Sequence, residues 1–238
     1  MNFLFINNLI SKYTRLVILP RIATALFIIL QIIGMTLYPG GTMFNFESEG
    51  YTFSENFFSD MGAYAARNGE PNYLSMILFS FSLTIVGVTF ILYYITLPLV
   101  FISNKLNYLL TLVGTLFAFT GSICLIGTGL TPSDLVLKSH QFFANNIFYS
   151  FLITSFFYMI AIFRSNQIEK KYAIGYFIFF LSIFIYVGIL NFGPSADLNN
   201  SALIFQVVSQ KLIVFVFVFS VLHQTFGFSK LNAKDMDT

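Results

Sequence analysis

Charged residues are scarce in this sequence, and their scarcity decides the class of protein. Lysine, arginine, aspartate and glutamate make up 9% of the 238 residues, whereas a soluble domain carries about 25%. A soluble fold is excluded because most of its surface would be apolar. With 57% hydrophobic residues and a mean hydropathy of +0.80, the chain is predicted to be an integral membrane protein. The net charge of +2 is too small to indicate nucleic-acid binding.

The sequence also contains no tryptophan, one cysteine and two histidines. Cys124 lies alone in an apolar run, which excludes an intramolecular disulfide and argues against a cysteine-based metal site. His140 and His223 are expected about 30 Å apart along the bundle and cannot share a metal, although a carboxylate site around His140 is an open alternative. No P-loop, dinucleotide fingerprint or nucleophile elbow is present. We therefore expect neither a metal nor a cofactor.

Six long apolar runs account for most of the chain. Each is long enough to cross a hydrocarbon core of about 30 Å at 1.5 Å per residue. The sequence predicts an all-α polytopic bundle of six transmembrane helices over residues 18–228, after an interfacial segment at 1–17 and before a disordered tail at 229–238. The expected helices span residues 22–38, 73–97, 106–130, 141–163, 172–191 and 201–226.

Basic residues alternate between the two predicted sides of the bundle. Nine lie near the termini or in the turns after the second and fourth helices, and only Arg67 and Lys138 lie on the other side. Because cytoplasmic loops carry the excess of lysine and arginine, both termini are predicted to be cytoplasmic. The long polar loop over residues 39–72 then lies outside.

Three polar stretches are predicted to meet in the outer half of the bundle. The first is ENFFSDMG at residues 55–62, inside the longest loop, and long loops tend to be functional. The second is the sequence TPSD at 131–134, together with His140. The third lies in the last apolar run, around Lys211.

Lys211 is the most informative single residue. It lies about 13–15 Å below the outer end of its helix, where a lysine costs about 2.5–3.5 kcal/mol to insert, so it should face the interior and have a partner. Gln206 and Gln210 are one turn apart and share a face. Two hypotheses stay open for Lys211. It binds an anion or head group or carries a proton, or it forms a structural ion pair with Asp60 or Asp134.

Asp60, Asp134 and His140 are the candidates for catalysis. A histidine titrates near pH 6.5 when unperturbed, so it could serve as a general base beside two carboxylates. The residues predicted to bind a ligand beside these three are Lys211, Gln206, Gln210, Ser59 and Glu55.

Structural roles are open alternatives for the same residues. Ser59 and Asp60 match the cap of a short helix running to Arg67. The sequence at residues 131–133 matches a helix start with proline in the first turn. His140 is equally consistent with an interfacial histidine that has no special role.

The segments FFSDMGAY, PNYLSMILFSFSLTIVG and GTGLTPSDLVLKSHQFFANNIF resemble the six-helix bacterial proteins of the DUF-nine-nine-eight family. That family is similar to the superfamily of DRAM and Frag/Sfk-type eukaryotic membrane proteins. The resemblance implies a bacterial inner (cytoplasmic) membrane, and its eukaryotic relatives point towards the handling of lipids and lipid anchors. The residues that carry it are Ser59, Asp60, Gly62, Pro71, Asp134 and His140.

Three functions follow as hypotheses. The first is lipid-related: a polar outer cavity binds or modifies a head group, with Lys211 facing the phosphate. The second is a scaffold that packs with other membrane proteins through phenylalanine-rich faces. The third is a small-solute or ion transporter. Membrane lipids are the expected partners in each case, and nucleic acid is not.

Overall fold

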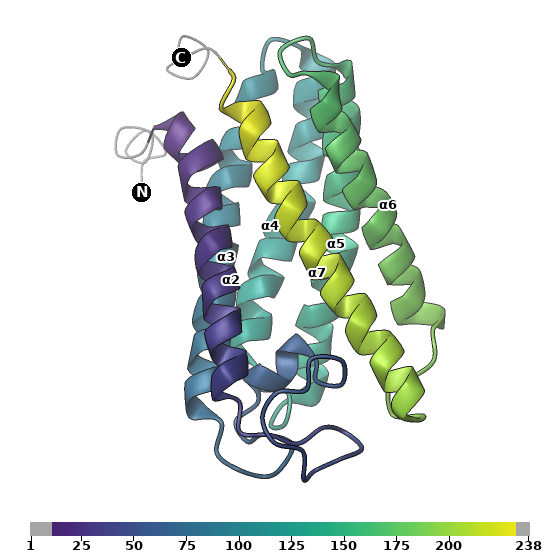
Figure 1. Ribbon diagram of the computed structural model, residues 1–238. Coiled ribbons are helices and arrows are strands. Elements are labelled where there is room, and N and C mark those ends of the chain that lie inside the picture. Colours follow the sequence, from purple (N-terminus) through teal and green to yellow (C-terminus); the bar gives the residue numbers. More distant parts are fainter. Residues whose placement is uncertain (1–10, 232–238) are drawn as a thin grey trace.

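The computed structural model describes residues 11–231. Every element of regular secondary structure in that range is a helix. Six helices in this range are long and apolar enough to cross a membrane, which confirms the expected architecture (Figure 1). The spans are Thr14–Leu37 (the π-helical turn Thr14–Ile18 and α2, Leu19–Leu37), Tyr73–Phe101 (α3, Tyr73–Thr96, and the 3-10 turn Leu97–Phe101), α4 Lys105–Leu130, α5 Leu137–Arg164, α6 Lys170–Phe192 and α7 Asn200–Phe228.

Local sequence explains most of the helix ends. Asn104 and Asn199 cap α4 and α7, accepting hydrogen bonds from Asn107 N at 3.0 Å and Ala202 N at 2.9 Å, as short polar side chains do at helix starts. The α-helix of the second span ends at Thr96, one residue from its predicted end. A 3-10 turn then extends the span to Phe101, because Pro98 near the start of that turn removes no needed donor.

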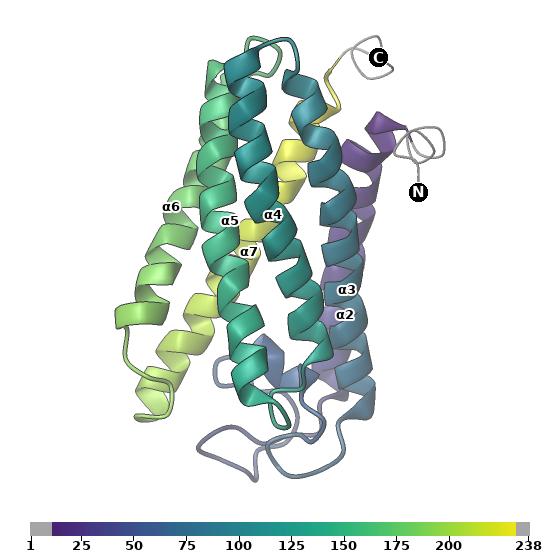
Figure 2. The ribbon, with the colours of Figure 1, turned by 180° about the vertical axis from the view of Figure 1, so that it is seen from behind.

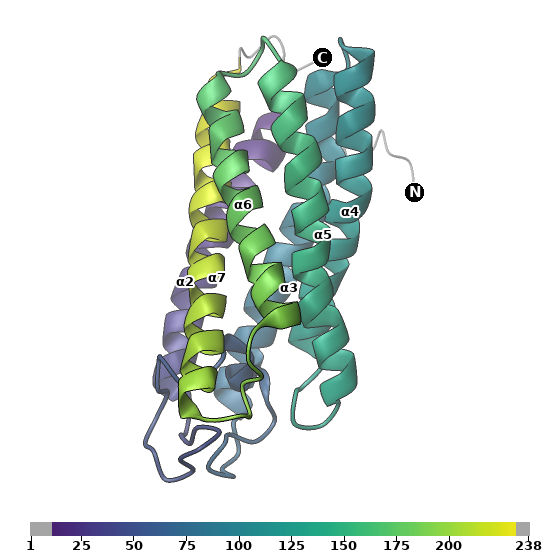
Figure 3. The same cartoon turned by 90° about the vertical axis from the view of Figure 1, so that its right-hand side faces the viewer.

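Each helix packs on the next one along the chain, and α7 closes the bundle by contacting both α6 and α2. Figure 1 shows α7 crossing obliquely between these two helices, and Figure 3 shows it beside α6. The start of α2 and the end of α7 lie at one end of the bundle, here called the terminal end. Residues 38–72 lie at the opposite end, here called the loop end, as the view from behind also shows (Figure 2).

Helices α4 and α5 approach closely because glycines face aromatic rings. A Cβ added at Gly121 would lie 2.9 Å from the ring of Phe151, and one at Gly114 would lie 3.0 Å from Tyr158. Small residues permit such close approach of transmembrane helices. These two glycines therefore serve packing.

Aromatic side chains fill the space between α7 and the rest of the bundle. The ring of Phe217 lies 5.4 Å from Phe90, 5.5 Å from Phe151 and 5.4 Å from Phe179, measured between centroids. These separations are typical of favourable ring pairs. The phenylalanines thus do more than face lipid: they hold the last helix against α3, α5 and α6.

The loop over residues 38–72 is folded, with only the 3-10 turn η2, Phe58–Gly62, as regular helix. The predicted short helix from Ser59 to Arg67 is wrong. Asp60 is the third residue of η2, and the turn ends at Gly62 because Ala63 is already extended, with φ −74° and ψ 149°. The predicted tail lies partly outside the described residues, as do residues 1–10 of the predicted interfacial segment.

Candidate functional site

Asp60 organises the loop. Its Oδ1 accepts hydrogen bonds from Arg67 Nε at 3.1 Å and Nη2 at 2.9 Å, while Oδ2 accepts from Phe57 N at 2.9 Å and from Asn56 Nδ2 at 3.4 Å. The residue is only 4% exposed. Burial lowers the pKa of the Arg67 guanidinium, but the adjacent Asp60 carboxylate outweighs this and the pKa is raised. Four donors converge on this carboxylate, so Asp60 connects four groups of the loop.

Two asparagines that the sequence analysis missed fix the loop from within. Asn56 is fully buried. Its Nδ2 donates to Gly41 O at 2.9 Å, and its Oδ1 accepts from Thr52 N at 2.9 Å. Asn72 donates to Met61 O and Ala63 O, both at 2.9 Å. All four partners are main-chain groups.

Lys211 is buried, as predicted, but not beside a carboxylate. Its Nζ donates a hydrogen bond of 2.5 Å to the main-chain oxygen of Asn56. The same nitrogen lies 5.3 Å from the ring centroid of Tyr51, 4.9 Å from Phe53 and 5.2 Å from Phe58. Such cation–π contacts contribute about 0.5–2 kcal/mol each. They offset part of the cost of burying the ammonium group.

The ion pair of Lys211 with Asp60 or Asp134, one of the two hypotheses for this lysine, is not formed. Across residues 11–231, no carboxylate oxygen lies within 4 Å of Lys211 Nζ. Asp60 pairs with Arg67 instead, at 2.9 Å.

Gln206 and Gln210 share a helix but serve two different loops. Gln210 Oε1 accepts a hydrogen bond of 3.0 Å from Phe58 N, in η2. Gln206 Nε2 donates to Pro194 O at 2.8 Å, in the connection between α6 and α7. The shared ligand-binding face predicted for the two glutamines is therefore divided between two structural contacts.

Asp134 and Glu55 also bind loop groups. Asp134 is exposed, and its two oxygens accept hydrogen bonds from Tyr64 N at 2.9 Å and Ala65 N at 3.0 Å. Glu55 Oε1 accepts a longer contact of 3.5 Å from Asn200 Nδ2. Asp134 thereby fastens the loop over residues 38–72 to the connection between α4 and α5.

His140 lies inside α5 rather than before it. The helix begins at Leu137, and the helix start predicted at residues 131–133 is wrong because Thr131 ends α4. His140 is 4% exposed, and its Nδ1 lies 2.7 Å from Thr131 O. In the described part of the chain, no hydrogen bond or ion pair joins His140 to Asp60 or Asp134. Catalysis by these three residues stays a prediction.

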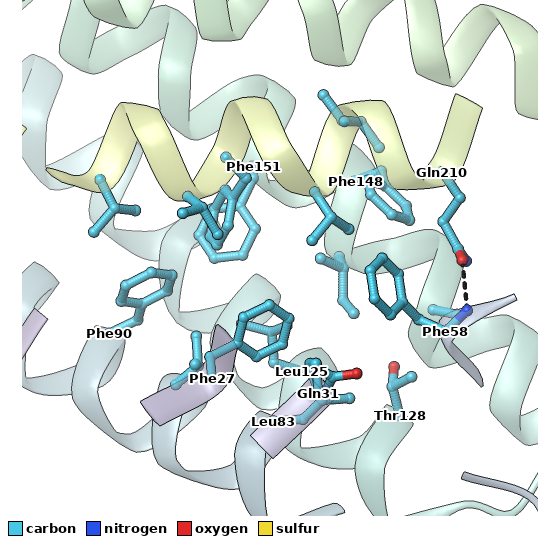
Figure 4. A pocket seen from close by; sticks show the side chains of 18 of the residues that line it. Phe27, Gln31, Phe58, Leu83, Phe90, Leu125, Thr128, Phe148, Phe151 and Gln210 are labelled. Atoms are coloured by element: carbon cyan, nitrogen blue, oxygen red, sulfur yellow. Dashed lines mark hydrogen bonds between the residues drawn. The ribbon is translucent and has the colours of Figure 1, made fainter. Parts of the chain in front are cut away.

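A cavity of about 120 Å³ lies inside the bundle below the loop (Figure 4). All six helices and the turn η2 contribute to its lining. Phe58 and Ser59 lie over its loop end, and Lys211 is not part of the lining. The polar cavity expected there is thus a largely apolar one. Its polar lining residues are Thr24, Gln31, Ser59, Thr128 and Gln210.

Gln31 is the most buried of these polar residues and was not singled out from the sequence. It is 3% exposed, and its Nε2 donates to Ser82 Oγ at 2.7 Å. Its Oε1 is buried and has no hydrogen-bond partner among the described residues. An amide inside an otherwise apolar run was the signal available in the sequence.

A second cavity of about 20 Å³ lies nearer the terminal end, between Tyr93, Tyr94, Tyr176 and Gln224. That volume admits about one water molecule.

Comparisons with protein-family models, curated proteins and solved structures find no match to this chain. The resemblance to the bacterial six-helix family therefore stays a prediction.

Proposed function

We propose that this membrane protein binds the hydrocarbon part of a lipid-like molecule in the 120 Å³ cavity, beneath the folded loop. The observation that supports this most directly is the lining. Six helices surround the cavity, and 18 of its 23 lining residues are apolar. An apolar cavity of similar size, about 150 Å³, stays dry and takes up small hydrocarbons.

The volume limits what enters. Typical small-molecule pockets measure about 300–1,000 Å³, so 120 Å³ accommodates a segment of one chain and not a two-chain phospholipid. An empty cavity costs about 24 cal/mol per Å³, which gives about 3 kcal/mol here. Hydrocarbon in the cavity would recover part of that cost.

The membrane orientation is part of the proposal. Eight basic residues of the described part of the chain lie at the terminal end, and by the positive-inside rule this favours a loop end outside the cytoplasm. A bacterial inner membrane is proposed from the resemblance. In this orientation the loop would separate the cavity from the external solution.

The transporter hypothesis has less support. The rings of Phe90, Phe179 and Phe217 line both this cavity and the smaller one nearer the terminal end, and they offer a solute no polar group between the two cavities. The scaffold hypothesis requires no cavity. It predicts that added hydrocarbon does not change the unfolding temperature.

The test is the unfolding temperature of the full-length protein in nanodiscs, titrated with n-pentane. A ligand at 100 times its Kd stabilises the folded state by about 2.7 kcal/mol, so the unfolding temperature should rise by several degrees. Val214→Phe fills the cavity and should abolish the rise. Val208→Phe adds the same ring on the outward face of α7 and should retain it. A wild-type protein that does not respond would refute the proposal.

A further inference from the structure

We propose that Arg21, at the junction of α2 with α7, binds the phosphate of an anionic lipid in the leaflet at the terminal end. Arg21 does not line the cavity, so this site is independent of the hydrocarbon binding proposed there. The inference names a class of lipid and a binding side chain that the sequence does not mark out from the other basic residues.

The Arg21 guanidinium is held in position by α7. Its Nε donates a hydrogen bond of 2.9 Å to Thr225 Oγ1, and its central carbon lies 4.6 Å from the centroid of the Phe226 ring. Thr225 donates its own hydroxyl hydrogen to Leu222 O at 2.7 Å, so its oxygen faces Arg21 as an acceptor. Figure 1 shows the start of α2 and the end of α7 side by side at this point. Arg21 is therefore oriented before any ligand binds.

Most donors of the Arg21 guanidinium have no partner in the protein. A guanidinium carries N–H donors on Nε and on both Nη groups, and only Nε bonds another described residue. No carboxylate oxygen of residues 11–231 lies within 4 Å of Arg21. The side chain is half-buried, and neither Nη1 nor Nη2 is enclosed by protein. These two groups form a flat edge of donors, which suits two oxygens of one phosphate.

The place of Arg21 in the bundle favours a lipid over a soluble anion. The first span begins at Thr14, so Arg21 lies about 10 Å along it by helix rise. An arginine at such a depth directs its charged group towards the lipid head groups, and an unpaired one is costly. The side chains of Ile18, Ile22 and Phe226 around it are apolar and exposed. An acyl chain covers such a surface, whereas a soluble phosphate gains nothing from it.

Charge at the terminal end favours a lipid without an ammonium group. Eight basic residues of the described chain lie there, and Glu169 is the only acidic one among residues 11–231. The Glu169 carboxylate is already paired, with Lys171 at 2.6 Å and with Lys230 at 2.9 Å. Phosphatidylcholine would bring a cation to an end of the bundle that offers it no unpaired carboxylate. Phosphatidylglycerol has the same phosphodiester and no cation, so it should be preferred.

The chain contains no tryptophan, so a single introduced tryptophan is a local reporter. Ile22→Trp places it beside Arg21, on the exposed face of α2. The full-length protein is placed in nanodiscs of phosphatidylcholine and phosphatidylglycerol, with bromine on the acyl chains of one lipid at a time. Bromine quenches tryptophan fluorescence on contact, so the two quenching curves give the relative affinity of the lipids at this position. We expect phosphatidylglycerol to bind about fivefold tighter, which corresponds to about 1 kcal/mol.

Matched variants assign the preference to Arg21. In the Ile22→Trp background, Arg21→Gln removes the guanidinium and should bring the two lipids to equal affinity. Arg164→Gln removes the same charge from the same end, where Arg164 Nε bonds Asn107 Oδ1, and it should keep the preference. Ile33→Trp reports from the exposed face of α2 nearer the loop end, about 17 Å away by helix rise. It should show no preference.

Equal quenching by both lipids at Ile22→Trp would overturn the proposal. A preference that survives in Arg21→Gln, or that Arg164→Gln also removes, overturns it too, because the basic end as a whole would then attract the lipid. Excess glycerol phosphate should leave the preference unchanged. If it abolishes the preference, the occupant is a soluble phosphate and the lipid assignment fails.

A second comparison applies if Arg21→Gln does not fold. A preference at Ile22→Trp with none at Ile33→Trp supports a site beside Arg21, and equal preferences at the two positions overturn it. The response of the cavity to pentane has no bearing on these results, so the two proposals stand or fall separately.

Discussion

The ammonium group of Lys211 donates a 2.5 Å hydrogen bond to the main-chain oxygen of Asn56. This contact joins the middle of the last helix to a loop 155 residues earlier in the chain. One residue before Lys211, Gln210 Oε1 accepts a hydrogen bond of 3.0 Å from Phe58 N. Two successive side chains of α7 thus hold the loop over the cavity, and the loop's position depends on both.

Lys211→Met should release the loop. The substitution keeps the length of the side chain but removes a hydrogen bond from a charged group, which contributes about 1.5–3 kcal/mol, together with three cation–π contacts. We expect faster hydrogen exchange of the amides at residues 51–58, measured by mass spectrometry, with little change in the helices. Lys105→Met, at the exposed start of α4, is the control and should leave the loop unaffected. Unchanged hydrogen exchange in Lys211→Met would show that Lys211 does not hold the loop in place.

Asp60→Asn should destabilise the loop and separate a structural role from a catalytic one. Asparagine has one acceptor oxygen and no charge, so it cannot satisfy Arg67, Phe57 N and Asn56 together. The Arg67 side chain is 37% exposed, so solvent weakens the pair. We therefore expect a loss of unfolding free energy of about 1–3 kcal/mol, less than for a fully buried pair. Thermal unfolding of the single variants and of Asp60→Asn with Arg67→Met gives the coupling between the two residues.

The coupling decides between the roles. A structural pair predicts that the double variant loses less than the sum of the single variants. If Asp60→Asn is instead as stable as the wild type, the carboxylate has no structural role and stays available for chemistry.

The sequence predicts the six helices well because membrane spans depend on length and hydropathy, which are read directly from the residues. It also predicts that Lys211 is buried, since a lysine at that depth needs partners. The sequence does not predict which group accepts the hydrogen bond from Lys211. Lys211, Asn56 and Asn72 bind main-chain oxygens, and every residue type carries one, so no side chain in the sequence marks the acceptor.

The cavity was mispredicted for a related reason. Polar residues near one end of the bundle suggested a polar site, yet Asp60, Asp134 and Gln206 all turn towards loop backbone and leave the interior apolar. Loops at a membrane surface contain many donors and acceptors that must be satisfied. Polar side chains near such loops therefore form hydrogen bonds with the loop backbone, and fewer of them face the interior.

Gly121→Ala should weaken the packing of α4 on α5. The added Cβ would lie 2.9 Å from the ring of Phe151, so the helices or the ring must move, at a cost of about 1–3 kcal/mol. Gly188→Ala in α6 is the matched control, because nothing lies within 4 Å of its new Cβ. It should leave the unfolding temperature unchanged or raise it slightly. Equal effects of both changes would mean that helix propensity, and not contact with Phe151, sets the outcome.

Stability should fall as pH rises above 10, and Tyr38 should account for part of the fall. Burial, followed by the charge of Asp60, raises the pKa of Tyr38 to about 12, against about 10 in the unfolded chain. Between these values the folded state holds one more proton than the unfolded state, so this contribution is complete below pH 10 and is lost towards pH 12, at up to about 1.4 kcal/mol per pH unit.

Tyr38→Phe cannot titrate. It loses the hydroxyl that accepts a 3.0 Å hydrogen bond from Arg67 N, which lowers stability equally at all pH values, but its curve between pH 10 and 12 should be flatter than that of the wild type. Denaturant unfolding at intervals of half a pH unit measures the slopes, and parallel curves would show that other groups, such as Tyr51 with its burial-raised pKa, control the alkaline loss.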